Sequence, residues 1–249
     1  MLKNPKKSFE ARFEVKDGKM PLKEELENAV QQNFQNQWKV REGRIVPEAT
    51  DLILGSDAVH FDNATLLYAD LADSTTLVKN YDWYFAAEIY KNFLYCAARI
   101  INDEGGKVRS YDGDRVMGVF IGKASNTIAT RCALKINYAV IHIIKPRLIK
   151  QYPSADYDIK HVVGVDFGEV RTARAGVRND NDLIWIGNSA NIAAKISSSN
   201  EGYSSVVTPQ VYETMNDSSK FFEGKNMWNS FYDREICRQL YGSSWYWPI

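Results

Sequence analysis

Residues 64–77, with the sequence ATLLYADLADSTTL, contain the pattern that decides the fold class. The first seven residues, 64–70, are mostly apolar and end in the carboxylate of Asp70, which is typical of a short buried strand. The next polar group, Asp-Ser-Thr at 73–75, has the side chains that favour a helix N-terminus. The stretch therefore predicts a strand that leads directly into a helix.

A second stretch, residues 105–120 with the sequence GGKVRSYDGDRVMGVF, predicts a hairpin. Residues 107–110 and 116–120 both resemble strands, and the Asp-Gly pair between them is a strong turn signal. Asp114 lies at the tip of this hairpin. Between the two stretches, apolar residues recur at steps of three or four with an interruption around Asp82, so a helix connects them.

The rest of the central region alternates in the same way. We expect a helix over 125–145 that Pro146 bends or ends, strands over 159–165 and 169–175 around Gly168, a strand over 183–186 and a helix over 188–197. The order strand–helix–strand–strand–helix–strand predicts an α+β fold with the split βαβ, ferredoxin-like arrangement. In such a sheet the first strand lies beside the hairpin, so Asp70 and Asp114 are expected at one edge.

The chain divides into a central domain and two extensions. Residues 1–60 are predicted as an N-terminal extension with a helix from Met20 to Gln37, which Pro21 begins. Residues 61–215 form the central domain. Residues 216–249 are polar and aromatic, and their pattern does not place them in the fold.

Composition excludes several classes of protein. Lys+Arg and Asp+Glu are both 31, so a net charge of zero gives no whole-chain attraction to nucleic acid or anionic membrane. The three cysteines are far apart, which disfavours a disulfide scaffold or a structural zinc site and fits a reducing compartment. The most apolar run, 138–144, is too short to span a bilayer. We therefore expect a cytoplasmic protein without direct membrane insertion.

Two carboxylates at one sheet edge have a specific chemical meaning. Paired carboxylates are the usual protein ligands of two divalent cations that promote phosphoryl displacement, and Mg²⁺ completes its coordination with substrate phosphates. The helix that follows Asp70 begins with free N–H groups that favour phosphate oxygens. A single aspartate in either position is more often a turn or cap residue. The interpretation as a cation site therefore depends on Asp70 and Asp114 lying close together.

Four motifs together resemble the class III nucleotidyl cyclases. Their sequences are YADLADSTTL (68–77), GGKVRSYDGDRVMGVF (105–120), VGVDFGEV (163–170) and WIGNSANIAAKIS (185–197). They follow the family's order and spacing over about residues 62–200. The resemblance implies an enzyme that cyclises a nucleoside triphosphate and releases diphosphate, with two Mn²⁺ or Mg²⁺ ions per site.

The resemblance also assigns residues. It implies that Asp70, Asp114 and the carbonyl of Leu71 bind the cations. It implies that the amides of Ala72, Asp73, Ser74 and Thr75 hold phosphate oxygens, and it places Arg178 close to the family's triphosphate-binding arginine. For Arg178, a solvated loop charge is an alternative.

A second group of residues is implied to act across a twofold, head-to-tail homodimer. Asn191 matches the asparagine that orients the ribose, and Lys195 stands where the family usually has a transition-state arginine. Lysine keeps the charge but loses the planar fork of donors. By the resemblance, both act on a substrate whose cations are bound by the other subunit.

The positions that read the base depart from purine-specific relatives. Ser110 and Ile184 replace the charged or polar pair that reads a purine edge, and Arg109 and Tyr111 lie beside Ser110. This set fits a smaller pyrimidine ring and resembles the bacterial Pycsar pyrimidine cyclases. It implies cyclic UMP, or cyclic CMP, as an antiphage second messenger for a separate effector protein. UTP is favoured over CTP, although no residue separates them by itself.

Two other functions stay open at this point. One is an adenylate cyclase with an atypical base pocket. The other is a nucleotide-binding regulatory module that has lost catalysis, which Lys195 favours and the two aspartates disfavour.

Overall fold

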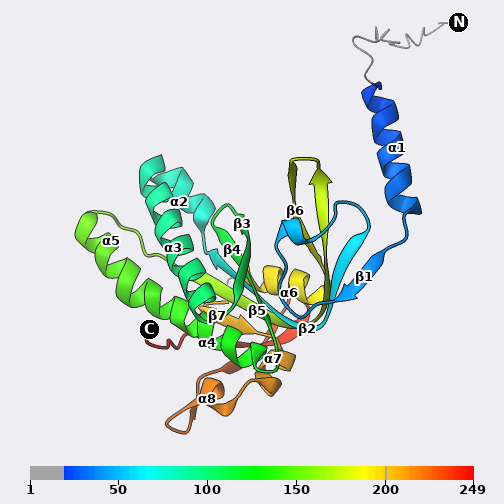
Figure 1. Ribbon diagram of the computed structural model, residues 1–249. Helices are drawn as coiled ribbons and strands as arrows, with labels where there is room; N and C mark the ends of the chain where they lie inside the picture. Colours follow the sequence, from blue (N-terminus) through cyan, green and yellow to red (C-terminus); the bar gives the residue numbers. More distant parts are fainter. Residues whose placement is uncertain (1–19, 200) are drawn as a thin grey trace, which may run out of the picture.

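The computed structural model describes residues 20–199 and 201–249. Its main feature is a nine-stranded sheet with helices on both faces (Figure 1). The strands of this sheet are β1 (Lys39–Glu42), β2 (Asp57–Leu71), β3 (Lys107–Asp112), β4 (Arg115–Ile121), β5 (His161–Val177), β6 (Asp180–Ile186), β7 (Ser205–Val207), β10 (Asn229–Asp233) and β11 (Arg238–Ser243). A separate hairpin is formed by β8 (Phe221–Phe222) and β9 (Lys225–Asn226).

Helices connect and flank these strands. The α-helices are α1 (Leu22–Gln35), α2 (Ser74–Asn80), α3 (Trp83–Asp103), α4 (Ser125–Tyr138), α5 (Lys145–Gln151), α6 (Asn188–Ser197), α7 (Pro209–Thr214) and α8 (Asp217–Lys220). A 3₁₀ turn, η1 (Ala49–Asp51), lies in the N-terminal segment, and a π-helical turn, η2 (Ala139–Ile144), joins α4 to α5.

The predicted ferredoxin-like core is confirmed by the strand order. Strands β5, β2, β4 and β3 are neighbours in that order, and every adjacent pair is antiparallel. The helices α2 and α3 connect β2 to β3, and α4 leads from β4 towards β5. This is the split βαβ arrangement. The interruption predicted near Asp82 separates α2 from α3.

Strand β2 supplies both hydrophobic cores through its alternation. Leu67, Ala69 and Leu71 are buried with α3 and α4 on one face, whereas Ala64 and Leu66 are buried with α6 on the other. Each fully buried leucine contributes roughly 1.5–3 kcal/mol to folding. The alternation also directs Asp70, one residue after Ala69, towards the α6 face.

Close packing of α6 on β5 explains one motif glycine. A Cβ at Gly164 would lie 2.4 Å from the carbonyl oxygen of Ala193 and 2.6 Å from the amide nitrogen of Ser197. No side chain fits there without moving the helix. The motif VGVDFGEV therefore places the helix that carries Asn191 and Lys195 directly against the sheet.

Two boundaries differ from the sequence prediction. Gly168 does not separate two strands, because it pairs with Ala64 within the continuous strand β5. Pro146 does not end the helical segment. It lies in the first turn of α5, where a missing N–H is tolerated, after the π-helical turn.

The N-terminal segment divides into two parts with different packing. Strand β1 pairs in parallel with the start of β2, and Val46 and Leu52 are buried beside Phe61. Residues 39–56 are therefore built into the sheet. Helix α1, in contrast, has no buried residue and projects away from the body (Figure 1). Residues 1–19 of the predicted extension lie outside the residues that the structure describes.

The aromatic C-terminus, which the sequence did not place, packs along α4. The Trp247 N–H donates to the Leu134 carbonyl at 3.1 Å, and the Asn137 side chain donates to the carbonyls of Ser244 and Trp245. Strands β10 and β11 extend the sheet beside β7. Across the described part of the chain, we find no helix with the length and apolarity that a bilayer crossing requires.

Candidate active site

The structure brings Asp70 and Asp114 to the same edge of the sheet. Asp70 is the penultimate residue of β2, and Asp114 lies in the turn between β3 and β4. The register pairs Ala69 with Val116, so each aspartate lies within two residues of that pair. The negative charge of Asp114 helps to raise the pKa of Asp70, which requires the two carboxylates to be close. Their predicted convergence is therefore observed.

The negative charge of the carboxylate pair is compensated only in part. Burial is the main cause that raises the pKa of Asp70 to about 6, and the charge of Asp114 adds to it. Arg115 and a 3.4 Å hydrogen bond from the Ser198 hydroxyl lower the pKa only in part. Among the described residues, Asp114 Oδ2 is buried without a hydrogen-bond partner. Two under-compensated carboxylates with an unpartnered oxygen fit divalent cations, which prefer oxygen ligands.

The loop after Asp70 has a strained backbone. Asp73 precedes α2 with a φ of 59°, in the left-handed region, and its side chain makes no capping hydrogen bond. The Ala72 N–H donates to the Lys160 carbonyl at 3.0 Å. The amide of Ala72 is therefore already engaged, which narrows the predicted phosphate contacts to residues 73–75.

A hollow of about 310 Å³ lies directly beside this loop. Its lining includes Ala72 and Asp73 together with Tyr157 and Lys160, from the segment that precedes β5. The Tyr157 hydroxyl is buried, and the described residues give it no hydrogen-bond partner. Burial raises the pKa of Tyr157, and nearby groups that include Asp114 add to the shift. The hollow thus offers a lysine and an unpartnered hydroxyl beside the loop that follows Asp70, together with the carboxylates of Asp156 and Asp158.

Tyr157 and Lys160 were not predicted from the sequence, although a signal existed. The first residue of β5, His161, pairs with Leu71 at the end of β2. Residues just before β5 must therefore lie close to the residues that follow Asp70.

Asn191 and Lys195 lie one helical turn apart on the exposed face of α6. The opposite face is buried through Ile192, Ala193 and Ile196. Neither side chain makes a hydrogen bond or ion pair within the described residues. The nearby positive charge that lowers the pKa of Asp70 belongs to Arg115, not to Lys195. Within one chain, these two residues therefore face outward.

Arg109 is held by the N-terminal segment. It is the extra residue of a bulge in β3, because Val108 pairs with Gly118 and Ser110 with Met117. Its two terminal nitrogens donate to the Glu48 carboxylate at 2.7 and 2.9 Å, and only 9% of its side chain is exposed. Its Nε–H is buried and has no partner among the described residues. The guanidinium thus has a fixed orientation.

The other predicted contacts are dispersed in a single chain. Tyr111 is 59% exposed and lies beside α3, whereas Ile184 is 45% exposed on β6, which three strands of the sheet separate from β3. Arg178 lies at the exposed tip of the β5–β6 hairpin. It is sixteen residues along the chain from Val162, which pairs with Asp70. The structure therefore does not bring Arg178 to the carboxylate pair of its own chain.

Two other features lie elsewhere in the fold. Ligand atoms of Glu42, His60 and Asp62 lie within 4.8 Å of one another, but His60 precedes Asp70 by ten residues on β2. Both ring nitrogens of His60 already contact carboxylates, at 2.8 Å to Glu42 and 2.9 Å to Glu169. The hydrogen bond to Glu42 is the main cause of its raised pKa.

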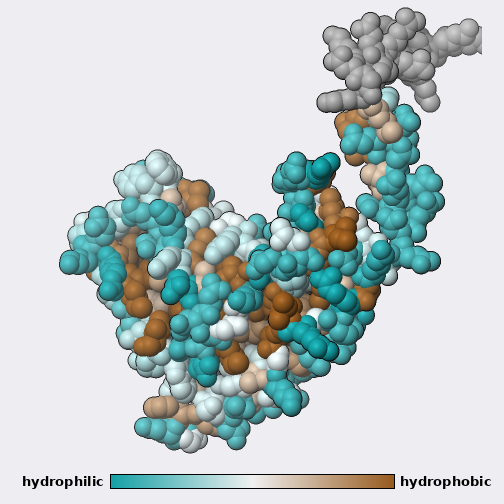
Figure 2. Space-filling view, viewed as in Figure 1, coloured by the Kyte–Doolittle hydropathy of each residue, from teal (hydrophilic) through white to brown (hydrophobic). Residues whose placement is uncertain are grey.

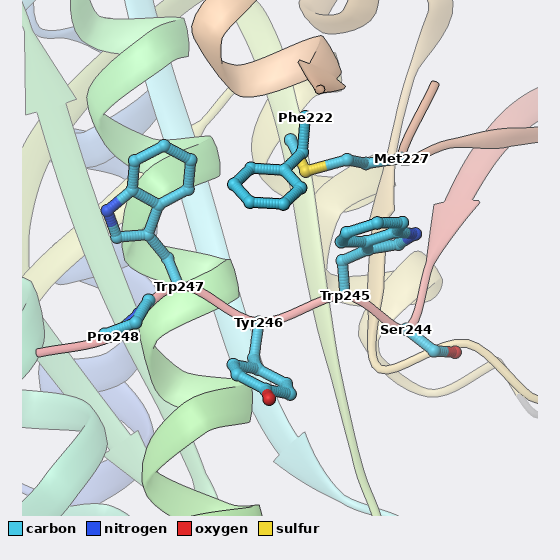
Figure 3. A pocket seen from close by; sticks show the side chains of 7 residues that line it. All are labelled: Phe222, Met227, Ser244, Trp245, Tyr246, Trp247 and Pro248. Carbon is cyan, nitrogen blue, oxygen red and sulfur yellow. The ribbon is translucent and has the colours of Figure 1, made fainter. Parts of the chain in front are cut away.

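An apolar cavity of about 690 Å³ lies at the C-terminal tail. Phe222, Met227, Trp245 and Trp247 point towards one side of the tail backbone, and Tyr246 points to the other (Figure 3). None of the predicted site residues lines this cavity.

A family profile, that of the adenylate and guanylate cyclase catalytic domain, matches residues 57–229. This range is more than half of the chain and includes both aspartates, Asn191 and Lys195. The chain belongs to this family. The resemblance found in the four motifs is thereby confirmed.

Individual proteins that are similar to this chain in sequence or in fold are also cyclases. A uridylate cyclase of Burkholderia cepacia is 45% identical over 231 residues, which cover 92% of this chain and 100% of the relative. A uridylate cyclase of Xanthomonas perforans is 44% identical over 236 residues, with 92% and 100% coverage. The solved adenylyl cyclase CyaB of P. aeruginosa superposes with a TM-score of 0.60 at 17% identity, covering 75% of this chain and 95% of that one. That structure shows that the cyclase fold is shared.

Proposed function

We propose that this cyclase converts UTP into cyclic 3′,5′-UMP and diphosphate. The observation that carries the proposal is the convergence of Asp70 and Asp114 into a pair whose negative charge is compensated only in part. The uridylate cyclases that are 44–45% identical to the chain over their whole length support a pyrimidine substrate. CTP, which would give cyclic CMP, is the nearest alternative substrate.

In this proposal, the residues at the sheet edge hold the reacting groups. Asp70, Asp114 and the Leu71 carbonyl would hold two divalent cations, Mn²⁺ or Mg²⁺. Such cations lower the pKa of the ribose 3′-hydroxyl and stabilise the diphosphate that leaves. The 3′-hydroxyl would lose its proton to solvent water, and its oxygen would form a bond to the α-phosphorus as the bond to diphosphate breaks. The amides of residues 73–75 and the ammonium of Lys160 bind phosphate oxygens.

The Glu48–Arg109 pair supports uracil over cytosine. A guanidinium has only donors, and Glu48 fixes its orientation through two hydrogen bonds. Uracil presents the O4 acceptor where cytosine presents an amino donor. A fixed donor facing this position matches uracil and leaves cytosine unpaired, which is the kind of mismatch that gives strong selectivity. Ser110 and Tyr111 complete the proposed base site, with Ile184 as the residue contributed by β6.

The outward direction of Asn191 and Lys195 supports a head-to-tail homodimer. In a twofold dimer, the same surfaces meet twice, so each α6 can approach the carboxylate pair of the other copy. Asn191 then orients the ribose, and Lys195 stabilises charge on the α-phosphate. Arg178 would bind the triphosphate only in such an assembly. Two equivalent sites result.

The proposal extends to the role of the product. By resemblance to the Pycsar cyclases, cyclic UMP is a second messenger that a separate effector protein senses during antiphage defence. A cytoplasmic location, where UTP is available, belongs to the same proposal. Purine cyclisation is the weaker alternative, since Ser110 and Ile184 offer no charged pair for a purine edge. A binding module without catalysis is favoured only by Lys195.

The test is a comparison of four nucleotides. The purified protein is incubated separately with UTP, CTP, ATP and GTP in Mn²⁺ or Mg²⁺, and products are separated by chromatography and identified by mass. We expect cyclic UMP as the main product. Cyclic AMP as the main product would contradict the base assignment, and binding of triphosphate without any cyclic product would support the regulatory module.

A further inference from the structure

Helix α1 carries an apolar ridge that nothing in the described chain covers. None of its 14 residues is buried. Leu22, Leu26, Val30 and Phe34 follow at four-residue steps and are 67, 54, 53 and 88% exposed. Residues four apart lie on one face of a helix, so they form a single ridge. The helix stands clear of the body in Figures 1 and 2.

Such a helix needs a partner to be stable. Helices of about 12–15 residues are marginal in water, and most helices in proteins depend on packing of an apolar face. The ion pair between Lys23 and Glu27, at 3.6 Å, is exposed and adds little to the stability of the helix. The ridge therefore marks α1 as one half of an interface.

A groove between α3 and β3 has the complementary features. It measures about 570 Å³, and its lining includes Lys91, Tyr95, Ala98, Arg99 and Tyr111. Tyr95 and Tyr111 are 68 and 59% exposed. Because tyrosines combine a large apolar ring with a polar tip and are enriched in interfaces, two exposed tyrosines in one groove are typical of a contact surface. Lys91, Tyr95 and Arg99 also follow at four-residue steps.

The ridge of α1 and the groove match each other in charge and in the spacing of their side chains. Helix α1 has three glutamates, Glu24, Glu25 and Glu27, against the single Lys23, which gives a net charge of −2. The groove is lined by two basic side chains and by no acidic one. Ridges at four-residue steps interlock when helices cross at about −50°. A two-stranded coil of α1 with its own copy would instead need alternating steps of three and four residues.

The groove of the same chain is out of reach. Tyr111 pairs with Val116, which pairs with Ala69, whereas α1 joins β1 opposite Asp57. Twelve residues of β2 separate Asp57 from Ala69, on the order of 40 Å for a straight strand. The connector of residues 36–38 spans at most about 11 Å, and the 14 residues of α1 add about 21 Å, so even the far end of the helix falls short of the groove. A helix tethered so far away does not lie within the groove.

We propose that α1 docks into the α3–β3 groove of a second copy of this chain. The ridge residues Leu26 and Val30 pack between Tyr95 and Tyr111 of that copy, and the acidic first turns of α1 face Lys91 or Arg99. The exchange of helices adds a contact to the proposed dimer that lies outside the catalytic residues. It does not require the protein to have cyclase activity.

Disulfide trapping tests the contact directly. One protein carries Val30→Cys and a second carries Ala98→Cys, both in a background in which Cys96 and Cys237 are replaced by serine. The two are mixed, oxidised and separated without reductant. We expect a cross-linked dimer that contains one chain of each kind. The control replaces Val30→Cys by Gln32→Cys, which lies on the opposite face of α1 and should give little product.

Three outcomes would overturn the proposal. The first is a dimer formed by the Val30→Cys protein with itself, which would show pairing of α1 with α1. The second is a bond within one chain when both cysteines are on the same molecule. The third is a yield no greater than that of the control.

A solution measurement complements the trapping. Leu26→Glu with Phe34→Glu should raise the dissociation constant of the dimer about 100-fold or more, because both side chains lose burial and gain charge. Gln32→Glu with Gln35→Glu adds the same charge on the opposite face and should change it little. Sedimentation equilibrium measures both. A monomeric wild-type protein would overturn the helix exchange, while the cyclase proposal is judged separately by its product.

Discussion

The carboxylate pair and the outer face of α6 hold the two halves of the proposed catalytic site in very different ways. Asp70 and Asp114 are brought together by the pairing of adjacent strands within one chain. Asn191 and Lys195 are fixed on a helix packed tightly on the sheet, yet they face outward without a partner. Folding of one chain is therefore sufficient to bring the two carboxylates together, whereas the proposed roles of Asn191 and Lys195 require a second molecule.

The largest expected effect tests whether the halves come from different chains. Asp114→Ala and Asn191→Ala should each abolish most turnover of UTP. Mixing the two variants under exchange conditions should restore about a quarter of wild-type activity, because half of the dimers are mixed and each has one intact site of two. Cyclic UMP formation measures the recovery.

A matched pair of variants controls this experiment. Asp70→Ala mixed with Asp114→Ala should stay inactive, since both lesions lie in the same half and every mixed site has one of them. Recovery in this control, or none in the first mixture, would contradict the division into halves.

Substitutions of Lys195 test only the half of the proposed site that α6 carries. Lys195→Ala should lower kcat by about 10²–10³, the usual loss when one preorganised charge-stabilising group is removed, with little change in KM. Lys195→Arg keeps the charge and supplies the planar fork that the family usually has, so it should retain most activity. Steady-state kinetics with UTP measure both. A nearly normal rate for Lys195→Ala would assign the charge to another residue.

Local sequence patterns predict the elements that carry both halves of the site for a physical reason. The strand that ends at Asp70 and the turn that holds Asp114 are local patterns, and their pairing follows from the strand order. The bounds of α6 are also local, and the predicted range 188–197 is the observed one. Periodicity and turn residues are sufficient for such features.

Periodicity and turn residues do not reveal contacts between segments that are distant in the sequence. The pairing of Glu48 with Arg109 joins residues 61 positions apart, and no motif marks it. The continuity of β5 through Gly168 depends on ladder hydrogen bonds with β2, which outweigh the local preference of glycine for turns. Tyr157 lies beside the carboxylates because of a strand register, not because of its neighbours in sequence.

Base selectivity is expected to change by a smaller factor. Arg109→Ala should lower the ratio of kcat/KM for UTP to that for CTP by about 10–100-fold, because the donor facing O4 is lost. Glu48→Gln should lower it less, since it leaves the guanidinium present but poorly held. Arg41→Ala is the control, because it removes an ion pair in the same segment, between Arg41 Nη1 and the Asp57 carboxylate, that lies away from β3. A selectivity change of the same size in the control would assign the effect to folding of the segment.

The smallest expected effect concerns the stability of the metal-free protein. The pKa of Asp70 is raised to about 6, so the folded state disfavours its ionised form relative to the unfolded chain. Stability from this group is therefore complete below about pH 4 and is lost as the pH rises through about 6. Asp70→Asn should raise the free energy of unfolding at pH 7.5 by about 1–2 kcal/mol, after allowance for solvent screening at a half-buried site.

Urea denaturation in chelator measures this difference, and pH 4 is its internal control, because wild type and variant should then be nearly equal. Addition of Mn²⁺ at pH 7.5 should stabilise the wild type and leave the variant almost unchanged, since ligands that bind only the folded state add to its stability. A variant that is less stable than wild type at both pH values would mean that Asp70 serves the fold. If Asp70 instead lowers the stability of the metal-free protein and raises that of the metal-bound protein, its role is to bind the cations and not to stabilise the fold.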